Sequence, residues 1–419
     1  MSDLIERDER VVWHPFTQRG MGGESFPVVS ARGTRLFLED GRSVIDAISS
    51  WWCNTLGHGH PELVKAAAEQ MARLDHVMFA NFTHEPAVAL AEDLLAALPK
   101  GYGKVFFSDN GSTACEVALK LGIQLFHNRG ERRSRVAALH GSYHGDTFGA
   151  MAAGARGLFT KPFEEMMFDV HYLAPDGGAD ECATFEEACR RGDLAAFIFE
   201  PLLQGAGGMR MYPQGVLEEY LSIARRYGVV TIADEVMTGF GRLGPLFASS
   251  LLSHRPDIVC LSKGLTGGTL PLAVTVVNDA LAAEFVSPDH SRTFFHGHTY
   301  TGNPTACAVA RRALALTQSA ECKGARVRIE NAHRSFAQAL KGSAAVTNVR
   351  VMGTVLAFDR VAALKGYDST SARGVADYFI RRGVLLRPLG EVLYVLPPYC
   401  ITDEELGEVY RAIEEFLRA

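Results

Sequence analysis

The feature that most constrains the fold is a series of short apolar runs between residues 104 and 277, separated by helical stretches. None of them shows the strict alternation of apolar and polar residues that is typical of a half-exposed strand. Strands that are covered by helices on both faces have this continuous apolar character. The runs are residues 104–107, 135–139, 195–199, 229–233, 258–261 and 272–277. We therefore predict an α/β fold with a mostly parallel sheet of about seven strands.

The two ends of the chain differ from this central region. Near the start, Asp40-Gly41 is a strong turn signal inside a predicted hairpin, and two helices that begin with proline are expected over 61–74 and 86–98. After residue 315 the pattern indicates a separate α+β unit. Its expected elements are helices 326–341, 371–382 and 403–418 and strands near 348–358, 384–387 and 393–396. We predict a large domain over 60–314 and a smaller, discontinuous domain made of 1–59 and 315–419.

Composition excludes several classes of function. A net charge of −6 gives no electrostatic footprint for nucleic acid or an anionic membrane. There is no apolar run of roughly 18 residues for a membrane span, and the charged first ten residues do not resemble a signal peptide. The eight cysteines are scattered without a C-x-x-C pair, as in proteins that keep reduced thiols. We expect a cytoplasmic globular protein.

Two polar clusters follow predicted strands near the middle of the chain. Gly111 and Ser112 open a helix directly after a strand, where backbone N–H groups and the helix dipole favour an anion. The alternative is an ordinary capped helix. Tyr143 stands between His140 and His144 and is suited to stack on a planar ring, although a packed turn is as good an explanation. No carboxylate or cysteine lies at ligand spacing from the two histidines, so no metal site is expected.

Two charged residues follow later strands. Asp234 ends an apolar run, where a buried carboxylate is costly unless it meets a cation such as a protonated pyridine nitrogen. Lys263 also follows an apolar run, and desolvation makes a lysine amine a nucleophile that is able to form a Schiff base. A helix cap and an exposed lysine are the simpler alternatives. Together with the anion site and the aromatic ring, these residues match what pyridoxal phosphate requires.

The segment from Asp234 to Arg242, followed by Ser262-Lys263-Gly264, resembles the signature of the class III (ω-amino) aminotransferases, which are fold-type I pyridoxal-phosphate enzymes. The resemblance extends from Trp13 to about Pro398, almost the whole chain. Four further segments resemble the members that aminate 8-amino-7-oxononanoate in biotin biosynthesis with S-adenosylmethionine as the amino donor. These segments are residues 13–17, 49–52, 144–151 and 204–212.

The resemblance implies a role for individual residues and a homodimer with shared active sites. It assigns catalysis to Lys263, Asp234 and Tyr143. Cofactor binding falls to these three and to Gly111, Ser112 and Thr299, the last reaching the site of the other subunit. Substrate binding is assigned to Phe16, Trp51, Trp52, Asp146, Gly297 and Arg387. Arg387 suits a substrate carboxylate because its planar fork binds two oxygens at once.

The expected reaction is a ping-pong transamination in which Asp234 keeps the pyridine nitrogen protonated and Lys263 moves the proton. We predict S-adenosylmethionine as the donor, and Phe16 keeps lysine as the alternative. Relatives that use S-adenosylmethionine usually carry tyrosine there, and some that use lysine carry phenylalanine. Another ω-aminotransferase, acting on ornithine, 4-aminobutyrate or a diamine, is a second interpretation. A pyridoxal-phosphate decarboxylase or aminomutase is a third.

Overall fold

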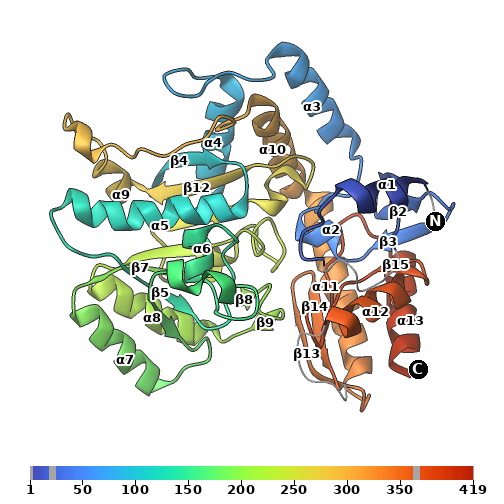
Figure 1. The fold of residues 1–419 in the computed structure, drawn as a ribbon. Coiled ribbons are helices and arrows are strands. Elements are labelled where there is room, and N and C mark those ends of the chain that lie inside the picture. The colour runs from blue at the N-terminus through green and yellow to red at the C-terminus, as the bar shows by residue number, and fades with distance from the viewer. Residues whose placement is uncertain (1–2, 18–24, 362–368, 419) are drawn as a thin grey trace. The chain divides into compact units, whose positions relative to one another are not determined.

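The computed structural model describes residues 3–17, 25–361 and 369–418, and the chain divides into two compact units. We call Met1–His60 with Gly324–Ala419 the terminal unit and Pro61–Lys323 the central unit. Figure 1 shows their elements in chain order. Within the described residues, no helix has the length and apolar character needed to cross a membrane. All eight cysteines are free thiols.

The central unit is built on a sheet of seven strands. They are β4 (Tyr102–Ser108), β5 (Arg135–Leu139), β6 (Val170–Leu173), β7 (Leu194–Phe199), β10 (Val230–Asp234), β11 (Ile258–Leu261) and β12 (Ala273–Asn278). Their order is β4-β12-β11-β10-β7-β5-β6, and only β12 is antiparallel to its neighbours. The predicted mostly parallel sheet is confirmed. Sequence patterns did not reveal β6, an edge strand in which His171 and Tyr172 interrupt the apolar run.

Helices cover both faces of this sheet. They are α3 (Pro61–Arg73), α4 (Glu85–Ala97), α5 (Gly111–Asn128), α6 (Phe148–Ala153), α7 (Ala179–Arg190), α8 (Gln214–Arg226), α9 (Asp279–Ala283) and α10 (Pro304–Thr317). Ile258 and Cys260 of β11 pack in one core cluster with α5, whereas Val259 and Leu261 pack in a second cluster with α4 and α10. Successive strand residues point to opposite faces, so covering both faces requires an unbroken apolar run.

Short elements complete the central unit. They are the paired strands β8 (Leu203–Gln204) and β9 (Arg210–Met211) and the 3₁₀ turns η1 (Lys161–Met166), η2 (Ala248–Leu251), η3 (Lys263–Thr266) and η4 (His290–Arg292). The helices predicted over 61–74 and 86–98 are present as α3 and α4. They differ in burial, because α4 buries Leu90 and Leu94 whereas α3 buries only Leu63 and leaves Met71 59% exposed.

The terminal unit has two small sheets. One has the order β1 (Val28–Arg32), β2 (Arg35–Leu38), β3 (Ser43–Asp46) and β15 (Val384–Leu385), and the other β13 (Val346–Met352), β14 (Val355–Arg360) and β16 (Val392–Val395). Its helices are α1 (Asp3–Val11), α2 (Ser49–Trp52), α11 (Ala320–Leu340, which begins in the central unit), α12 (Ser369–Ile380) and α13 (Asp403–Arg418). The predicted hairpin is the β2–β3 pair. The parallel β3–β15 pair joins segments from both ends of the chain in one sheet.

Candidate active site

One edge of the central sheet collects the carboxyl ends of β4, β5, β7, β10 and β11. The last four of these strands are mutually parallel. β4 points the same way, because both β4 and β11 are antiparallel to the strand β12 between them. The register sets Asp234 beside Cys260 and Ser108 beside Ala273. The polar clusters that follow these strands therefore emerge along the edge where open α/β sheets bind ligands.

Asp234 is the most enclosed charged group at this edge. Its side chain is 5% exposed, and its Oδ2 lies 2.7 Å from Nδ1 of His144, which is fully buried. The backbone N–H of Val236 donates to Oδ1 at 3.1 Å. A buried carboxylate needs such partners to offset the loss of hydration. Sequence reasoning treated His144 only as part of an aromatic turn and missed its pairing with Asp234.

Two thiols lie behind Asp234. Cys115 comes from α5 and Cys260 from β11, and both are fully buried. A hydrogen bond with Cys260 and burial raise the pKa of the Cys115 thiol well above its usual range, and the charge of Asp234 adds to this effect. Cys115 therefore stays protonated at neutral pH. It contributes a neutral, weakly polar wall beside the carboxylate.

The structure brings Cys115, His144 and Asp234 close enough to be candidate metal ligands. One ligand atom from each lies within 4.8 Å of the others. The sequence argument considered only spacing along the chain. It was wrong to find no carboxylate or cysteine near the histidines, because these groups come from different elements of the fold. His144 and Asp234 already use one atom each in their mutual hydrogen bond. That bond accounts for their proximity without a metal.

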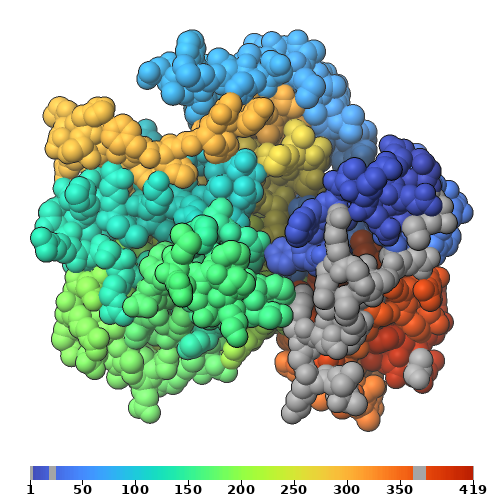
Figure 2. Space-filling view, viewed as in Figure 1, coloured from blue at the N-terminus to red at the C-terminus, as the bar shows by residue number. Residues whose placement is uncertain are grey.

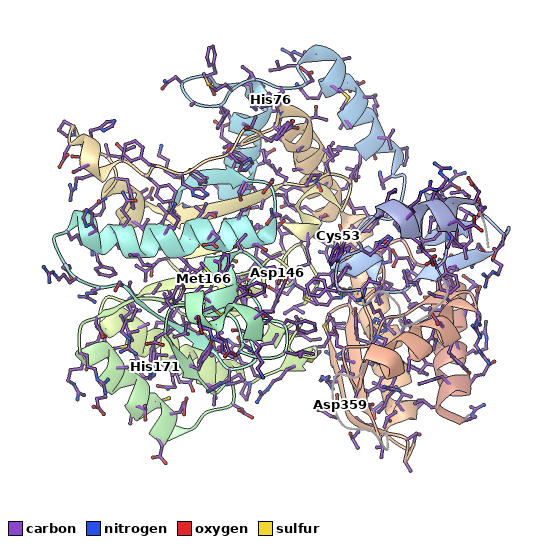
Figure 3. All side chains as sticks on the ribbon, in the orientation of Figure 1. Cys53, His76, Asp146, Met166, His171 and Asp359 are labelled. Carbon is purple, nitrogen blue, oxygen red and sulfur yellow. The ribbon has the colours of Figure 1, made fainter. Side chains whose placement is uncertain are left out.

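Tyr143 follows β5 and is held at both ends. Its hydroxyl donates to Oδ2 of Asp146 at 2.9 Å, and its backbone N–H donates to Oε1 of Glu200 at 3.1 Å. Burial, followed by the charge of Asp146, raises the pKa of the Tyr143 hydroxyl, which keeps it a hydrogen-bond donor. Figure 3 labels Asp146 beyond the end of β5.

Glu200 is a buried acid that sequence reasoning did not single out. It follows β7 and accepts the backbone N–H groups of Tyr143 and Gly205 on its two oxygens, at 3.1 and 2.8 Å. Burial raises the pKa of Glu200 to about 7. Glu200 fixes the backbone of Tyr143, and so it links the ends of β5 and β7.

The amino terminus of α5 has the form of an anion site. The Asn110 side chain caps the helix by accepting the N–H of Thr113, and the backbone N–H of Asn110 donates to Oγ1 of Thr113. The first turn of a helix has four N–H groups without partners in the helix, so those of Gly111 and Ser112 remain for a ligand. Ser112 Oγ accepts the N–H of Asp146 at 3.1 Å.

Two glycines permit the close packing at this helix terminus. A Cβ on Gly111 would lie 2.6 Å from Cγ1 of Val236. A Cβ on Gly145, where φ is +130°, would lie 2.2 Å from Oγ of Ser112. Neither position has room for a side chain. The amino-terminal end of α5 therefore lies directly against the segments that follow β5 and β10.

Lys263 begins η3, two residues after β11 ends. It is half-buried, between Ser262 and the fully buried Leu265. Ser262 Oγ donates to the carbonyl of Leu272 at 2.9 Å, which anchors the turn to the segment before β12. Asp234 and Lys263 thus follow neighbouring strands, as the sequence predicted.

Thr299 and Gly297 lie apart from these residues, in the loop between η4 and α10. Both are exposed. Two contacts on either side of Gly297 hold this loop. His296 Nδ1 lies 3.0 Å from Nζ of Lys120, and the N–H of His298 donates to Oγ1 of Thr301. The structure therefore presents Thr299 at a surface of the central unit.

The remaining predicted residues form a cluster in the terminal unit. The ring of Phe16 lies edge-on to that of Trp51 at 5.6 Å, and the guanidinium of Arg387 lies 4.7 Å from the Trp51 ring. Arg387 also donates to the Phe16 carbonyl at 3.4 Å. Trp51 is 39% exposed, whereas Trp52 is 4% exposed and donates from Nε1 to the hydroxyl of Tyr394 at 2.9 Å. Trp51 is therefore the accessible ring of the pair.

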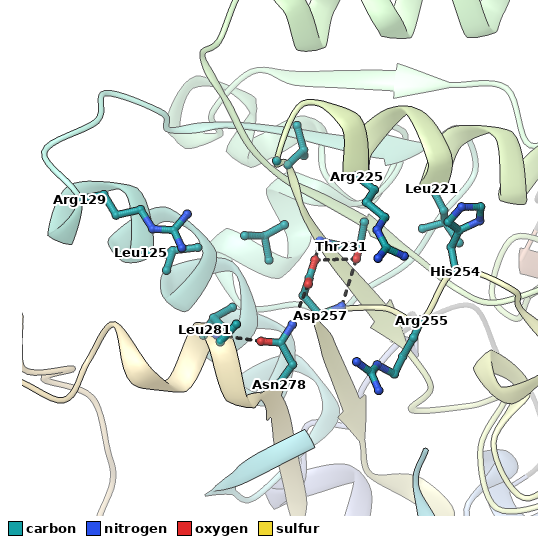
Figure 4. Close-up of a pocket in the computed structure, with 14 residues that line it drawn as sticks. Leu125, Arg129, Leu221, Arg225, Thr231, His254, Arg255, Asp257, Asn278 and Leu281 are labelled. Atoms are coloured by element: carbon teal, nitrogen blue, oxygen red, sulfur yellow. Dashed lines mark hydrogen bonds between the residues drawn. The ribbon is translucent and has the colours of Figure 1, made fainter. Parts of the chain in front are cut away.

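A cavity of about 360 Å³ lies at the opposite end of the central strands, where β10 begins (Figure 4). Its lining includes Val230 and Thr231 at the start of β10, together with Arg225, Arg255 and Asp257. Asp234 ends the same strand. The cavity and the cluster around Asp234 therefore lie at opposite ends of β10, and the cavity contains none of the predicted site residues.

The donor set fits pyridoxal phosphate. Four groups at the carboxyl ends of four different strands provide what this cofactor needs. They are the closely packed anion site at the start of α5, a hydrogen-bonded tyrosine, a buried carboxylate and a lysine. This fold and arrangement define a fold-type I pyridoxal-phosphate enzyme. The family model for class-III aminotransferases matches residues 18–417, and the chain belongs to that family.

Its relatives include enzymes with a specific printed name. The chain is 47% identical to the adenosylmethionine-8-amino-7-oxononanoate aminotransferase of Synechococcus elongatus, over 97% of this chain and 98% of the relative. It is 32% identical to the enzyme of that name from Saccharomyces cerevisiae, over 100% and 96%. The crystal structure of the Methanocaldococcus jannaschii enzyme of that name superposes with a TM-score of 0.93 at 31% identity, covering 98% of each chain.

A second solved structure bears on the cofactor. It is an amine transaminase from an uncultivated Pseudomonas species in its pyridoxal-phosphate-bound form, with a TM-score of 0.88 at 28% identity. The superposition covers 96% of this chain and 97% of the transaminase. Pyridoxal phosphate is thus the cofactor that both the family and a bound structural neighbour indicate.

Proposed function

We propose that this chain transfers an amino group to 8-amino-7-oxononanoate and forms 7,8-diaminononanoate, a step of biotin biosynthesis, with S-adenosylmethionine as the donor. The names and full-length similarity of its relatives support this reaction. The observation that carries the chemistry is the placement of Asp234 and Lys263 after adjacent strands, with the anion site of α5 at the same edge. We also propose that the protein is cytoplasmic.

Five residues of the central unit would hold the cofactor. Gly111 and Ser112 would bind the phosphate with N–H groups at the start of α5. Tyr143 would lie against the ring, Asp234 would contact the pyridine nitrogen, and Lys263 would bond to the aldehyde carbon. When bound, pyridoxal phosphate supplies a ring that draws electrons from the substrate carbon.

Asp234 acts by holding a proton on the pyridine nitrogen. His144 takes up Oδ2 and the Val236 N–H points at Oδ1, so the carboxylate is fixed in one orientation before the cofactor arrives. An oriented buried carboxylate stabilises positive charge without reorganisation during the reaction. His144 is therefore a positioning residue in this proposal.

Lys263 carries out the proton transfers. Its Nζ would remove the proton from the amine-bearing carbon of the donor in the first half-reaction, and the donor would leave as a keto compound. In the second half-reaction it would deliver a proton to the carbon of 8-amino-7-oxononanoate that receives the amine. Lys263 is half-buried at the start of η3, which partly shields its amine from water.

The terminal unit would contribute substrate recognition through Phe16, Trp51, Trp52 and Arg387. The accessible Trp51 ring offers a flat surface for adenine and attracts a sulfonium cation by its face. Arg387 would bind a substrate carboxylate with its fork of donors. Asp146 and Gly297 of the central unit are also proposed to contact substrate. One observation favours lysine as the donor instead, namely that Phe16 has no hydroxyl to offer S-adenosylmethionine.

We further propose a homodimer in which Thr299 reaches the phosphate of the neighbouring subunit. The segments before α4 and before α10 lie together on one face of the central unit (Figure 2). The two segments are in contact, since the ring of His76, labelled in Figure 3, lies 5.3 Å from that of Tyr300 and the Asn303 side chain donates to the Asp75 carbonyl. Exposed apolar side chains on these segments and on α3 are Val64, Met71, Met78, Phe82, Phe295 and Tyr300. Such a patch beside Thr299 suits a subunit interface.

The cofactor assignment is tested by chemical fixation. Reduction of the holoenzyme with borohydride should attach the cofactor covalently to Lys263, and peptide mapping should find it on that residue alone. Lys263→Ala should bind cofactor without being labelled, and Lys161→Ala, at an exposed lysine, should be labelled as the wild type is. Labelling of another lysine in the wild type contradicts the assignment.

A further inference from the structure

The two tryptophans of the terminal unit lie in a left-handed turn. Ser49, Ser50, Trp51 and Trp52 have φ angles of 52°, 45°, 74° and 76°, and none is glycine. Residues with a Cβ are strained in this region and visit it singly as a rule. Four in succession persist only where the surroundings determine the backbone, and such strain is concentrated at functional sites.

Asp46 supplies the contacts that hold the turn. This carboxylate is fully buried at the end of β3. Its Oδ1 accepts the backbone N–H groups of Ile48 at 3.3 Å and Ser50 at 2.8 Å, and its Oδ2 accepts the Ser50 hydroxyl at 2.7 Å. Three hydrogen bonds to one side chain therefore fix Ile48 and Ser50, on either side of Ser49.

His58 completes the arrangement from the far side of the turn. Its Nε2 lies 2.9 Å from Oδ2 of Asp46, and its Nδ1 lies 3.0 Å from Nδ2 of Asn54. The Asn54 amide donates to Nδ1, so Nε2 carries the proton that His58 donates to Asp46. The backbone closes over the same turn, since the N–H groups of Asn54 and of Cys53, labelled in Figure 3, both donate to the Ser49 carbonyl.

The two ends of the turn are tied to the strand β16 and the segment after it. Ser49 Oγ donates to the Leu396 carbonyl at 2.8 Å, and Trp52 Nε1 donates to the Tyr394 hydroxyl at 2.9 Å. Trp52 is thereby held inside the unit, while Trp51 is left outward beside Phe16 and Arg387. The direction of the Trp51 ring therefore depends on the backbone of the turn as well as on its contacts with Phe16 and Arg387.

We propose that Asp46 and His58 are positioning residues that hold this left-handed turn and so fix the Trp51 ring for the amino donor. The inference rests on the proposed function, in which Trp51 contacts S-adenosylmethionine. Loss of the Asp46 and His58 contacts lets the turn relax toward ordinary backbone angles, and the Trp51 ring then turns away from the donor. Donor binding weakens, while the cofactor residues and the proton transfer by Lys263, all in the central unit, are unaffected.

The test uses single-turnover kinetics of the holoenzyme with S-adenosylmethionine, followed by cofactor absorbance. Asp46→Asn keeps one acceptor for the backbone N–H groups but cannot accept from His58. It should weaken the apparent dissociation constant for the donor at least tenfold and change the maximal rate less than threefold. His58→Gln should give a smaller shift of the same kind, and Asp46→Glu should not restore the wild-type constant because its carboxylate stands one methylene further out.

A matched control is Asp257→Asn in the central unit. Asp257 also accepts backbone and side-chain hydrogen bonds, from Thr231 and Asn278, and it lies at the other edge of the sheet from Asp234. It should lower the melting temperature without altering the donor constant. Should Asp46→Asn fail to fold, His58→Gln carries the test.

The outcomes separate the two claims. Wild-type donor constants in folded Asp46→Asn or His58→Gln contradict the positioning role, as does an equal weakening in Asp257→Asn. A wild-type enzyme that does not react with S-adenosylmethionine contradicts the proposed function and, with it, this inference.

Discussion

The two units differ in how they set up their candidate functional residues. In the central unit, Asp234, Lys263 and the start of α5 follow regular strands, and the register of the sheet brings them to one edge. In the terminal unit, Trp51 lies in a strained turn held by the buried carboxylate of Asp46 and by a few further hydrogen bonds at its ends. Regular topology therefore positions the proposed cofactor residues, whereas a local, irregular turn positions Trp51, the proposed substrate contact.

This difference has a consequence for substitution. Sheet register is held by many hydrogen bonds and two core clusters, so we expect one substitution at the carboxyl ends of the strands to alter chemistry without moving its neighbours. The left-handed turn depends on few contacts, so one change there alters the direction of a ring. We expect variants of the central unit to affect rate and variants of the terminal unit to affect substrate affinity.

Asp234→Asn should give the largest effect. It should bind cofactor but transaminate about a thousandfold more slowly, on the order of 4 kcal/mol, because a neutral amide does not hold the proton on the pyridine nitrogen. Steady-state assay of diaminononanoate measures the change. The control is Asp257→Asn, which should keep the wild-type rate. An Asp234→Asn rate within tenfold of wild type shows that another group holds the nitrogen.

Mixed dimers test whether the central unit's site is complete in one subunit. Lys263→Ala and Thr299→Glu should each be inactive, the second because a carboxylate replaces the hydroxyl proposed to bind phosphate. A mixture allowed to exchange should regain about a quarter of wild-type activity, because half the dimers carry one intact site. Mass spectrometry confirms exchange. Exchanged dimers without activity contradict the role of Thr299.

Glu200 should give a pH effect on stability. Its pKa rises from 4.5 to about 7 on folding, so the folded state binds the proton more tightly. Wild type should therefore lose on the order of 3 kcal/mol of unfolding free energy as pH rises from about 4.5 to 7. Urea denaturation should show that Glu200→Gln lacks this loss. Exposed Glu164→Gln serves as the control, and parallel pH curves for wild type and Glu200→Gln contradict the account.

Phe16→Tyr should give the smallest effect, confined to affinity. A hydroxyl gained beside Trp51 adds one neutral hydrogen bond, about 0.5–1.5 kcal/mol, and lowers the Michaelis constant for S-adenosylmethionine up to about tenfold. The constant for 8-amino-7-oxononanoate should stay nearly unchanged. Phe163→Tyr, on an exposed turn of the central unit, controls for the added hydroxyl. A changed maximal rate in Phe16→Tyr conflicts with the division of labour between the units.

The sequence was sufficient to predict the sheet and the strand ends that carry Asp234 and Lys263. Apolar runs and the polar residues that follow them are local patterns, so they are visible without the structure. The pairing of His144 with Asp234 spans 90 positions, and that of Trp52 with Tyr394 spans 342. Such contacts depend on strand order, which local patterns do not give. Glu200 was missed for the same reason.

The strained turn also had no local signal. Ser49-Ser50-Trp51-Trp52 contains no glycine or asparagine, the residues that usually mark positive φ. The exposure of apolar residues on α3 was also not predicted, because periodicity does not say whether the same chain or a second subunit covers an apolar helix face.

The most direct test of the proposed function is the first half-reaction. Purified holoenzyme is mixed with S-adenosylmethionine, without the second substrate, and the cofactor absorbance is followed; lysine is tested in a parallel sample. We expect S-adenosylmethionine to convert the cofactor to its aminated form, and subsequent 8-amino-7-oxononanoate to reverse the change and yield diaminononanoate. Conversion by lysine and not by S-adenosylmethionine contradicts the proposed donor, and conversion by neither contradicts the proposed reaction.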